Sequence, residues 1–88
     1  MNDYNLSQNF PNPFNPETNI MYDLPVDGDV ELNIYDISGK FIKALVNDFK
    51  PAGNYSISFN ASELPSGVYL YTLKVSGYTK TLRMAVIK

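Results

Sequence analysis

The sequence predicts an all-β fold, and three observations support this prediction. Apolar and polar side chains alternate in several short runs, most clearly in Asn54–Asn60 and Tyr69–Val75, as they do in strands with one buried face. Pro, Gly, Asn and Asp residues separate these runs at short intervals, where they favour turns. The composition, 44% hydrophobic and 14% aromatic, is that of a folded chain rich in residues that sheets favour. For 88 residues we expect one domain with a single core.

The first strand is expected at Leu6–Phe10, where the chain enters the proline-rich segment Pro11–Pro16. Three prolines so close together cannot donate backbone hydrogen bonds to a sheet, so this segment is predicted to be a rigid crossing rather than a flexible linker or a polyproline ligand. We expect Phe10 and Phe14 to pack into the end of the sandwich. The asparagines of the segment are expected to bond to neighbouring amides as Asx-type turns.

The next two runs, Thr18–Leu24 and Val30–Ile34, alternate again and are separated by Pro25–Asp29, a loop of hairpin length. We therefore expect these two strands to pair antiparallel. A turn at Asp36–Gly39 leads into Lys40–Val46, whose apolar spacing fits a strand or a short helix. A strand is predicted there because the run begins directly after a turn and its neighbours are strands.

The second half of the chain continues the same pattern. Asn47–Gly53 is predicted to be a loop, and Asn54–Asn60 a strand with its aromatic and aliphatic side chains inward. Tyr69–Val75, which follows a turn containing Pro and Gly, is expected to be the central strand, and Thr79–Ile87 the last one. About seven short strands at this spacing predict an antiparallel immunoglobulin-like or fibronectin-like sandwich. The absence of Trp and Cys argues against an antibody-type domain.

Composition also limits the function. The chain has no Cys and no His, so it has no disulfide framework, no zinc site of the usual kind, no catalytic thiol and no histidine base. We expect no enzyme activity and no cofactor. A net charge of −2 and a pI of about 4.8 argue against nucleic acid or an anionic membrane as partner. No apolar run is long enough to insert into a membrane as a helix.

Two small-ligand sites can be considered from the residue types. Loop carboxylates suit calcium, but here they lack the spacing of an EF-hand. Tyrosines can form a platform for sugar, although packing in the core or at a strand edge is the stronger interpretation. The carboxylates are Asp23, Asp27, Asp29 and Asp36, and the tyrosines are Tyr35, Tyr69, Tyr71 and Tyr78.

The charges are distributed unevenly along the chain. All seven Lys and Arg residues follow Gly39, whereas seven of the nine acidic residues precede it. The simpler interpretation is that acidic strands of the first half lie beside basic strands of the second. The alternative is that the basic C-terminal end is presented to a partner.

Six short motifs occur in a fixed order along the chain: Asn9–Pro16, Leu24-Pro25, Tyr35–Lys40, Ala52–Tyr55, Leu64–Tyr69 and a basic, apolar ending. Together they resemble the type A C-terminal sorting domain, or Por secretion tail, of proteins exported by the type IX secretion system of Bacteroidetes and related phyla. The same motifs resemble the related immunoglobulin-like domain of the flagellar hook-capping protein. The resemblance covers residues 6–88, which we expect to form the sorting domain. Residues 1–5 are expected to be a linker remnant or an added start.

The resemblance implies a monomeric sandwich at the C-terminus of a secreted or cell-surface protein that passes through the periplasm. Its implied partners are an upstream cargo domain in the same polypeptide, the type IX translocon and a sortase-like peptidase. The family's turn motifs fall on Pro11, Asn12, Pro13, Gly39, Gly53 and Gly67, with its aromatic at Tyr69. Its terminal recognition region falls on the last strand, where the expected partner-binding residues are Lys80, Arg83, Val86, Ile87 and Lys88.

We expect the activity of such a domain to be its own recognition. An exposed strand edge and the basic final strand would dock onto a translocon component by strand addition and charge complementarity. The alternative is an accessory sandwich of a cell-surface hydrolase that binds glycan or stabilises its neighbour. Flagellar hook assembly is set aside because hook-capping proteins continue past this domain.

Overall fold

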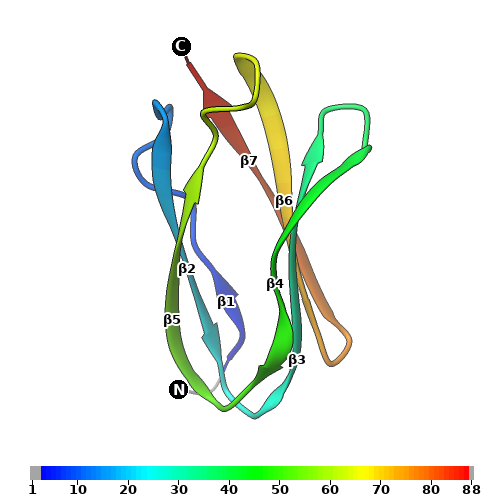
Figure 1. The fold of residues 1–88 in the computed structure, drawn as a ribbon. Coiled ribbons are helices and arrows are strands. Elements are labelled where there is room, and N and C mark those ends of the chain that lie inside the picture. The colour runs from blue at the N-terminus through cyan, green and yellow to red at the C-terminus, as the bar shows by residue number, and fades with distance from the viewer. Residues whose placement is uncertain (1–2, 88) are drawn as a thin grey trace.

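The computed structural model describes residues 3–87, which form two antiparallel sheets packed face to face (Figure 1). The described residues contain no helix, and thus none that has the length and hydropathy to cross a membrane. The predicted all-β sandwich of seven strands is confirmed. The strands are β1 (Asn5–Leu6), β2 (Glu17–Leu24), β3 (Gly28–Asp36), β4 (Phe41–Lys50), β5 (Gly53–Asn60), β6 (Gly67–Val75) and β7 (Tyr78–Val86).

The strand order is β1-β2-β5 in one sheet and β4-β3-β6-β7 in the other. The predicted β2–β3 hairpin is therefore wrong, because these two strands lie in different sheets. Both β2 and β3 bury every second side chain fully, as Ile20 and Leu24 do in β2 and Leu32 and Ile34 do in β3. Strands patterned in this way can face each other across a core as well as pair side by side, and a loop of hairpin length serves either connection.

Strand β4 is longer than predicted and includes Asn47–Lys50, which was expected to be a loop. Among the described strands it pairs with β3 alone, and the pairing register shifts twice along its length. These irregularities explain why its apolar residues do not alternate strictly. As an edge strand it leaves most of its side chains exposed, so its last residues carry no apolar pattern that sequence reasoning can detect.

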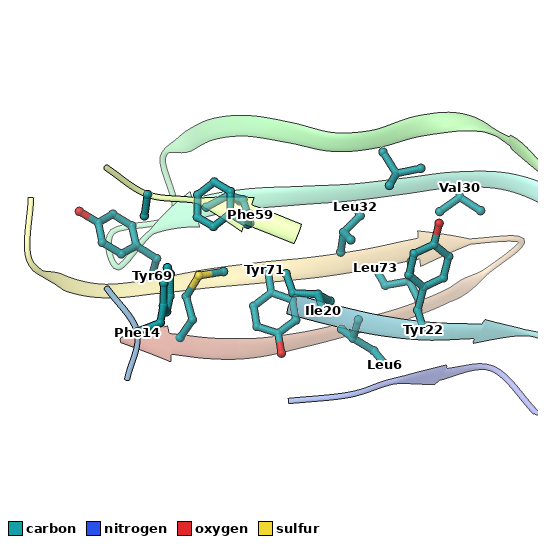
Figure 2. Packing of buried hydrophobic residues seen from close by; sticks show 14 of the residues in the cluster. Leu6, Phe14, Ile20, Tyr22, Val30, Leu32, Phe59, Tyr69, Tyr71 and Leu73 are labelled. Atoms are coloured by element: carbon teal, nitrogen blue, oxygen red, sulfur yellow. The ribbon is translucent and has the colours of Figure 1, made fainter. Parts of the chain in front are cut away.

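The core lies between the sheets and is centred on β6, as predicted (Figure 2). This strand is hydrogen-bonded to both β3 and β7, and Tyr69, Tyr71, Leu73 and Val75 all point inward. They pack against inward residues of β2, of β3 and of the loop before β2. Burying a side chain of this size stabilises the fold by about 1.5–3 kcal/mol.

The N-terminal segment departs from the predicted continuous strand. Only Asn5–Leu6 forms β1, and Phe10 makes a single bridge to Asn19. Phe14 is buried as predicted, but the side chain of Phe10 is 76% exposed on the outer face of the sheet. The interruption has a physical cause, because Asn9 turns inward to bond with buried polar groups and so carries Phe10 to the opposite side.

Candidate functional site

The final strand β7 is an edge strand that pairs with β6 along its whole length, from Gly67 opposite Val86 to Val75 opposite Tyr78. Its side chains alternate between the two faces of the sheet. Met84 and Val86 point into the core, whereas Thr81 and Arg83 point outward, and Ile87, directly after the strand, is exposed. The strand therefore contributes to the core and to the outer surface at once.

The five residues expected to bind a partner do not form one surface. Arg83 and Ile87 share the outer face, while Lys80 lies opposite Leu73 at the rim of the inner face and is exposed. Arg83 and Lys80 make no ion pair with any described residue. Val86 is buried in the core with 2% of its surface exposed, and Lys88 lies outside the described residues.

The C-terminal half of the β7 edge is covered by residues 8–14, which we call the N-terminal clamp. The Phe14 N–H donates to the Ala85 carbonyl at 3.0 Å, and the Ile87 N–H donates to the Phe14 carbonyl at 3.0 Å. The Gln8 side-chain amide donates to the Arg83 carbonyl at 2.6 Å. Two segments from opposite ends of the sequence are thereby joined.

Asn12 supplies the remaining contact of the clamp, because its Oδ1 accepts from the Ala85 N–H at 2.9 Å. The predicted local Asx-type turn is thus wrong for this residue, whose partner lies 73 positions further along the chain. Pro11 and Pro13 on either side have no N–H, so the polar contacts of this stretch come from carbonyls and the amide side chain. Asn15 is exposed and bonds to no described residue.

Asn9 holds the clamp against the sandwich and was not identified from the sequence, apart from its place in a motif. It is 98% buried, and its side-chain amide has hydrogen-bond partners for both Oδ1 and Nδ2. Its N–H donates to the Tyr71 hydroxyl at 2.8 Å, and its Nδ2 donates to Thr18 Oγ1 at 3.0 Å and to the Pro11 carbonyl at 3.1 Å. The Gln8 side chain donates to its Oδ1 at 2.7 Å. No periodic pattern marks such a residue.

Tyr71 connects the two sheets at the same place. Its hydroxyl donates to the Ser7 carbonyl at 2.7 Å while accepting from the Asn9 N–H. Desolvation by burial raises the pKa of Tyr71 to about 12. The central strand β6 therefore holds both its neighbour β7 and the clamp that covers β7.

Two turns with the pattern Pro-x-Gly-x-Tyr begin β5 and β6, at Pro51–Tyr55 and Pro65–Tyr69. In each, the tyrosine hydroxyl donates to the proline carbonyl at 2.6 Å, and the second matches the tyrosine corner of immunoglobulin-like domains. Gly53 and Gly67 have φ values of 154° and 158°, which side-chain-bearing residues rarely adopt. The sequence contains this repeat, yet it was not recognised there.

The turn after β3 is organised by Asp36. Its Oδ1 accepts from the Ser38 N–H at 2.9 Å, the Ser38 hydroxyl at 2.6 Å and the Lys40 N–H at 2.9 Å. The hydrogen bonds with Ser38 and Lys40 lower the pKa of Asp36 below its usual value. Gly39 has a φ of 92°, as its predicted turn role requires.

The remaining candidate calcium ligands are also engaged or dispersed. Asp23 accepts from the Asn54 side-chain amide at 2.6 Å, and Asp27 accepts from the Ala52 N–H at 2.7 Å. Among residues 3–87, no three acidic side chains gather closely enough to hold a metal ion.

The tyrosines proposed as a sugar platform do not share a surface. Tyr69 and Tyr71 are buried in the core, and Tyr78 stacks on Tyr4 with ring centroids 4.9 Å apart. Tyr35 lies on the outer face of the same four-stranded sheet, where it contacts Phe41 edge to face. Their arrangement rules out a common platform in this structure.

A groove of about 400 Å³ opens between β4 and the segment after β5. Ile42, Phe59 and Leu64 form its apolar lining, and Lys43 and Glu63 lie at its sides. These groups can hold an apolar side chain, but they do not form a nucleophile–base pair.

Comparison with known proteins identifies a family for most of the chain. The model of one protein family, described as the secretion system C-terminal sorting domain, matches residues 8–88, from the first residue of the clamp through β7. No curated protein matches the chain.

Proposed function

The chain belongs to the family of secretion system C-terminal sorting domains, and from this premise we propose that it directs an attached cargo protein through the type IX secretion system to the cell surface. The domain itself is non-catalytic under this proposal. The cargo precedes it in the same polypeptide, and the translocon and a sortase-like peptidase recognise the domain once it has entered the periplasm.

The observation that carries this proposal is the construction of the final strand. Arg83 is exposed on β7 without an ion-pair partner among the described residues, and the strand end beside it is fixed by the clamp. An uncompensated cation on a rigid strand is suited to steering and orienting an acidic partner. The positive charge of Arg83 is therefore available to a partner, because no described side chain neutralises it.

Strand addition is possible on only part of the β7 edge. Backbone groups of alternate residues point to the same edge, so those of Thr79 and Thr81 face the same way as those of Ala85 and Ile87. The clamp occupies the edge at Ala85 and Ile87. No described residue forms a hydrogen bond with the backbone groups that Thr79 and Thr81 present at this edge. A partner that adds a strand to β7 would do so at residues 79–81, with side-chain recognition at Arg83.

A deletion and a charge reversal test the proposal together. Removal of Ala85–Lys88 is expected to abolish export of a reporter fused upstream of Leu6. This deletion also removes the buried Val86, so a second variant that spares the core is needed. Lys80→Glu with Arg83→Glu changes only exposed side chains and should lower export by about tenfold or more, because each 1.4 kcal/mol of lost affinity is tenfold.

The matched control is Lys43→Glu with Lys50→Glu, which changes the net charge equally on β4, the edge strand at the opposite side of the same sheet. Secretion is measured in a bacterium with a type IX system and in its translocon-null mutant. Undiminished export of both the deletion and the charge-reversed variant, or equal export from both strains, would contradict the proposal. The glycan-binding alternative is not proposed, because the tyrosines that suggested it are dispersed.

A further inference from the structure

The outer faces of the two sheets differ in character. In the sheet of β1, β2 and β5 the outward residues are polar apart from Met21 and the bridge residue Phe10, for example Asn19 opposite Ser58 and Asp23 opposite Asn54. The four-stranded sheet instead carries apolar side chains at the end where β7 finishes. We call this group the end patch, and it consists of Tyr35, Phe41, Val68, Leu70 and Ile87.

The strand register makes the end patch continuous. Phe41 lies opposite Tyr35, and Tyr35 lies opposite Leu70. Residues directly opposite each other on adjacent strands project to the same face, so these side chains form a row across β4, β3 and β6. Val68 lies on the same face of β6, two residues before Leu70. Its cross-strand neighbour on β7 is Ala85, and Ile87 follows two residues after Ala85.

The end patch makes no contribution to the core. Its side chains point away from the opposite sheet, and Phe41, Val68 and Ile87 are 54%, 42% and 52% exposed. Exposed apolar groups gathered on one face are typical of protein-binding sites. The described chain begins at the other end of the sandwich (Figure 1), so a cargo attached upstream leaves this end accessible.

Charge at the border of the patch indicates what a partner must carry. Arg83 lies directly opposite Leu70, and its guanidinium makes no ion pair with any described residue. The nearby acidic group, Asp36, is already engaged by three hydrogen bonds within its own turn. The uncompensated charge at this border is therefore positive.

We propose that the end patch is a docking surface for a translocon protein whose matching surface presents apolar side chains and a carboxylate for Arg83. This inference rests on the proposed sorting function and names the chemistry of its partner. Aromatic residues and arginine contribute most of the affinity at protein interfaces, provided that surrounding contacts exclude water. In the end patch, the aromatic residue Phe41 lies at one end of the row and Arg83 at the other.

Strand β4 provides a matched pair of variants. Phe41 belongs to the patch, whereas Phe49 lies on the same strand and the same outer face at its far end, opposite Asp29. The two rings are 54% and 57% exposed. Phe41→Ser is expected to weaken docking by about tenfold or more, as hot-spot truncations do, and Phe49→Ser to leave it unchanged. Val68→Thr keeps a β-branched side chain and serves as a second patch variant.

The experiment measures binding of the purified 88-residue chain to outer-membrane vesicles from a type IX-proficient bacterium and from its translocon-null mutant. Unfolding in urea verifies that every variant is folded. Binding to proficient vesicles alone, weakened by Phe41→Ser and Val68→Thr but not by Phe49→Ser, is the expected result. Equal binding by all variants would overturn the inference. So would a dimer that Phe41→Ser converts to a monomer, because a second copy would then cover the patch.

Export of the wild-type reporter fusion separates this inference from the proposed function. Equal export by both strains, or export by neither, overturns the sorting function and this partner with it. Export by the proficient strain alone, together with equal vesicle binding by the Phe41 and Phe49 variants, overturns only the end patch.

Discussion

Tyr71 performs two tasks with one side chain. Its ring fills the centre of the core, and its hydroxyl satisfies two backbone groups of the N-terminal segment, the Asn9 N–H and the Ser7 carbonyl. A buried N–H that loses its acceptor costs more than a lost bond at the surface, because water cannot replace the partner. The hydroxyl of Tyr69 donates one hydrogen bond, to the Pro65 carbonyl in an exposed turn.

Tyr71→Phe is therefore expected to lower the free energy of unfolding by about 1–3 kcal/mol, and Tyr69→Phe by about 1 kcal/mol or less. Urea unfolding at pH 7 measures both. A smaller loss for Tyr71→Phe than for Tyr69→Phe would contradict the assignment of Tyr71 as the main polar link between sheets.

Tyr71 should also make stability depend on alkaline pH. The pKa of Tyr71 is raised to about 12 in the folded state, whereas an unfolded tyrosine titrates near 10. Between these pH values the unfolded chain has released a proton that the native chain retains, so rising pH favours unfolding. Wild-type stability should fall from about pH 10 towards pH 12, and Tyr71→Phe should reduce this slope. Urea unfolding at pH 9, 10 and 11 measures the difference, and equal slopes would contradict it.

The N-terminal clamp lies beside β7 like a partial fifth strand of the four-stranded sheet. An uncovered edge strand offers its backbone groups to other chains, and natural proteins cover or charge such edges. The clamp covers β7 next to Arg83 and Ile87, while β7 at residues 79–81 and the outer edge of β4 stay open. The residues at the end of β7 are thereby held in place for recognition without being free to pair.

Asn12→Ala is expected to loosen this contact, because it removes the acceptor of the Ala85 N–H. The amides of Ala85 and Ile87 should exchange with solvent faster, and stability should fall by about 1 kcal/mol. Asn15→Ala, in the same loop but without a described bond, is the control. Hydrogen exchange followed by NMR gives the rates residue by residue, and unchanged protection of Ala85 in the Asn12 variant would refute the clamp's role.

Sequence patterns predicted the elements better than their partners. Alternation identified β2, β3, β5, β6 and β7, because each buries one face against the same core. Pairing was harder to predict, since the β2–β3 loop suits a hairpin and a crossing between sheets equally. The clamp could not be predicted, because Asn9 and Asn12 bond to Tyr71 and Ala85, which are close only after folding.

At the scale of the whole molecule, the sandwich separates attachment from recognition. The longest dimension of the domain is 37 Å, and the described chain begins at one end of it and finishes at the other (Figure 1). The end patch and Arg83 lie at the finishing end, beside Ile87. A cargo joined upstream of β1 therefore approaches the domain from the side away from the proposed docking surface.

This geometry predicts that export depends on the end of the domain to which a protein is fused. A folded reporter joined upstream of Leu6 should be exported, whereas the same reporter joined after Lys88 should block export. The reason is steric, since a folded domain at the second position lies over the end of β7 and the end patch. Secretion assays in the proficient strain measure both fusions, and thermal unfolding should show that each keeps a folded sandwich. If both fusions are exported equally, recognition cannot depend on that end of the molecule, and the open edge at residues 79–81 or the outer edge of β4 would become the better docking candidate.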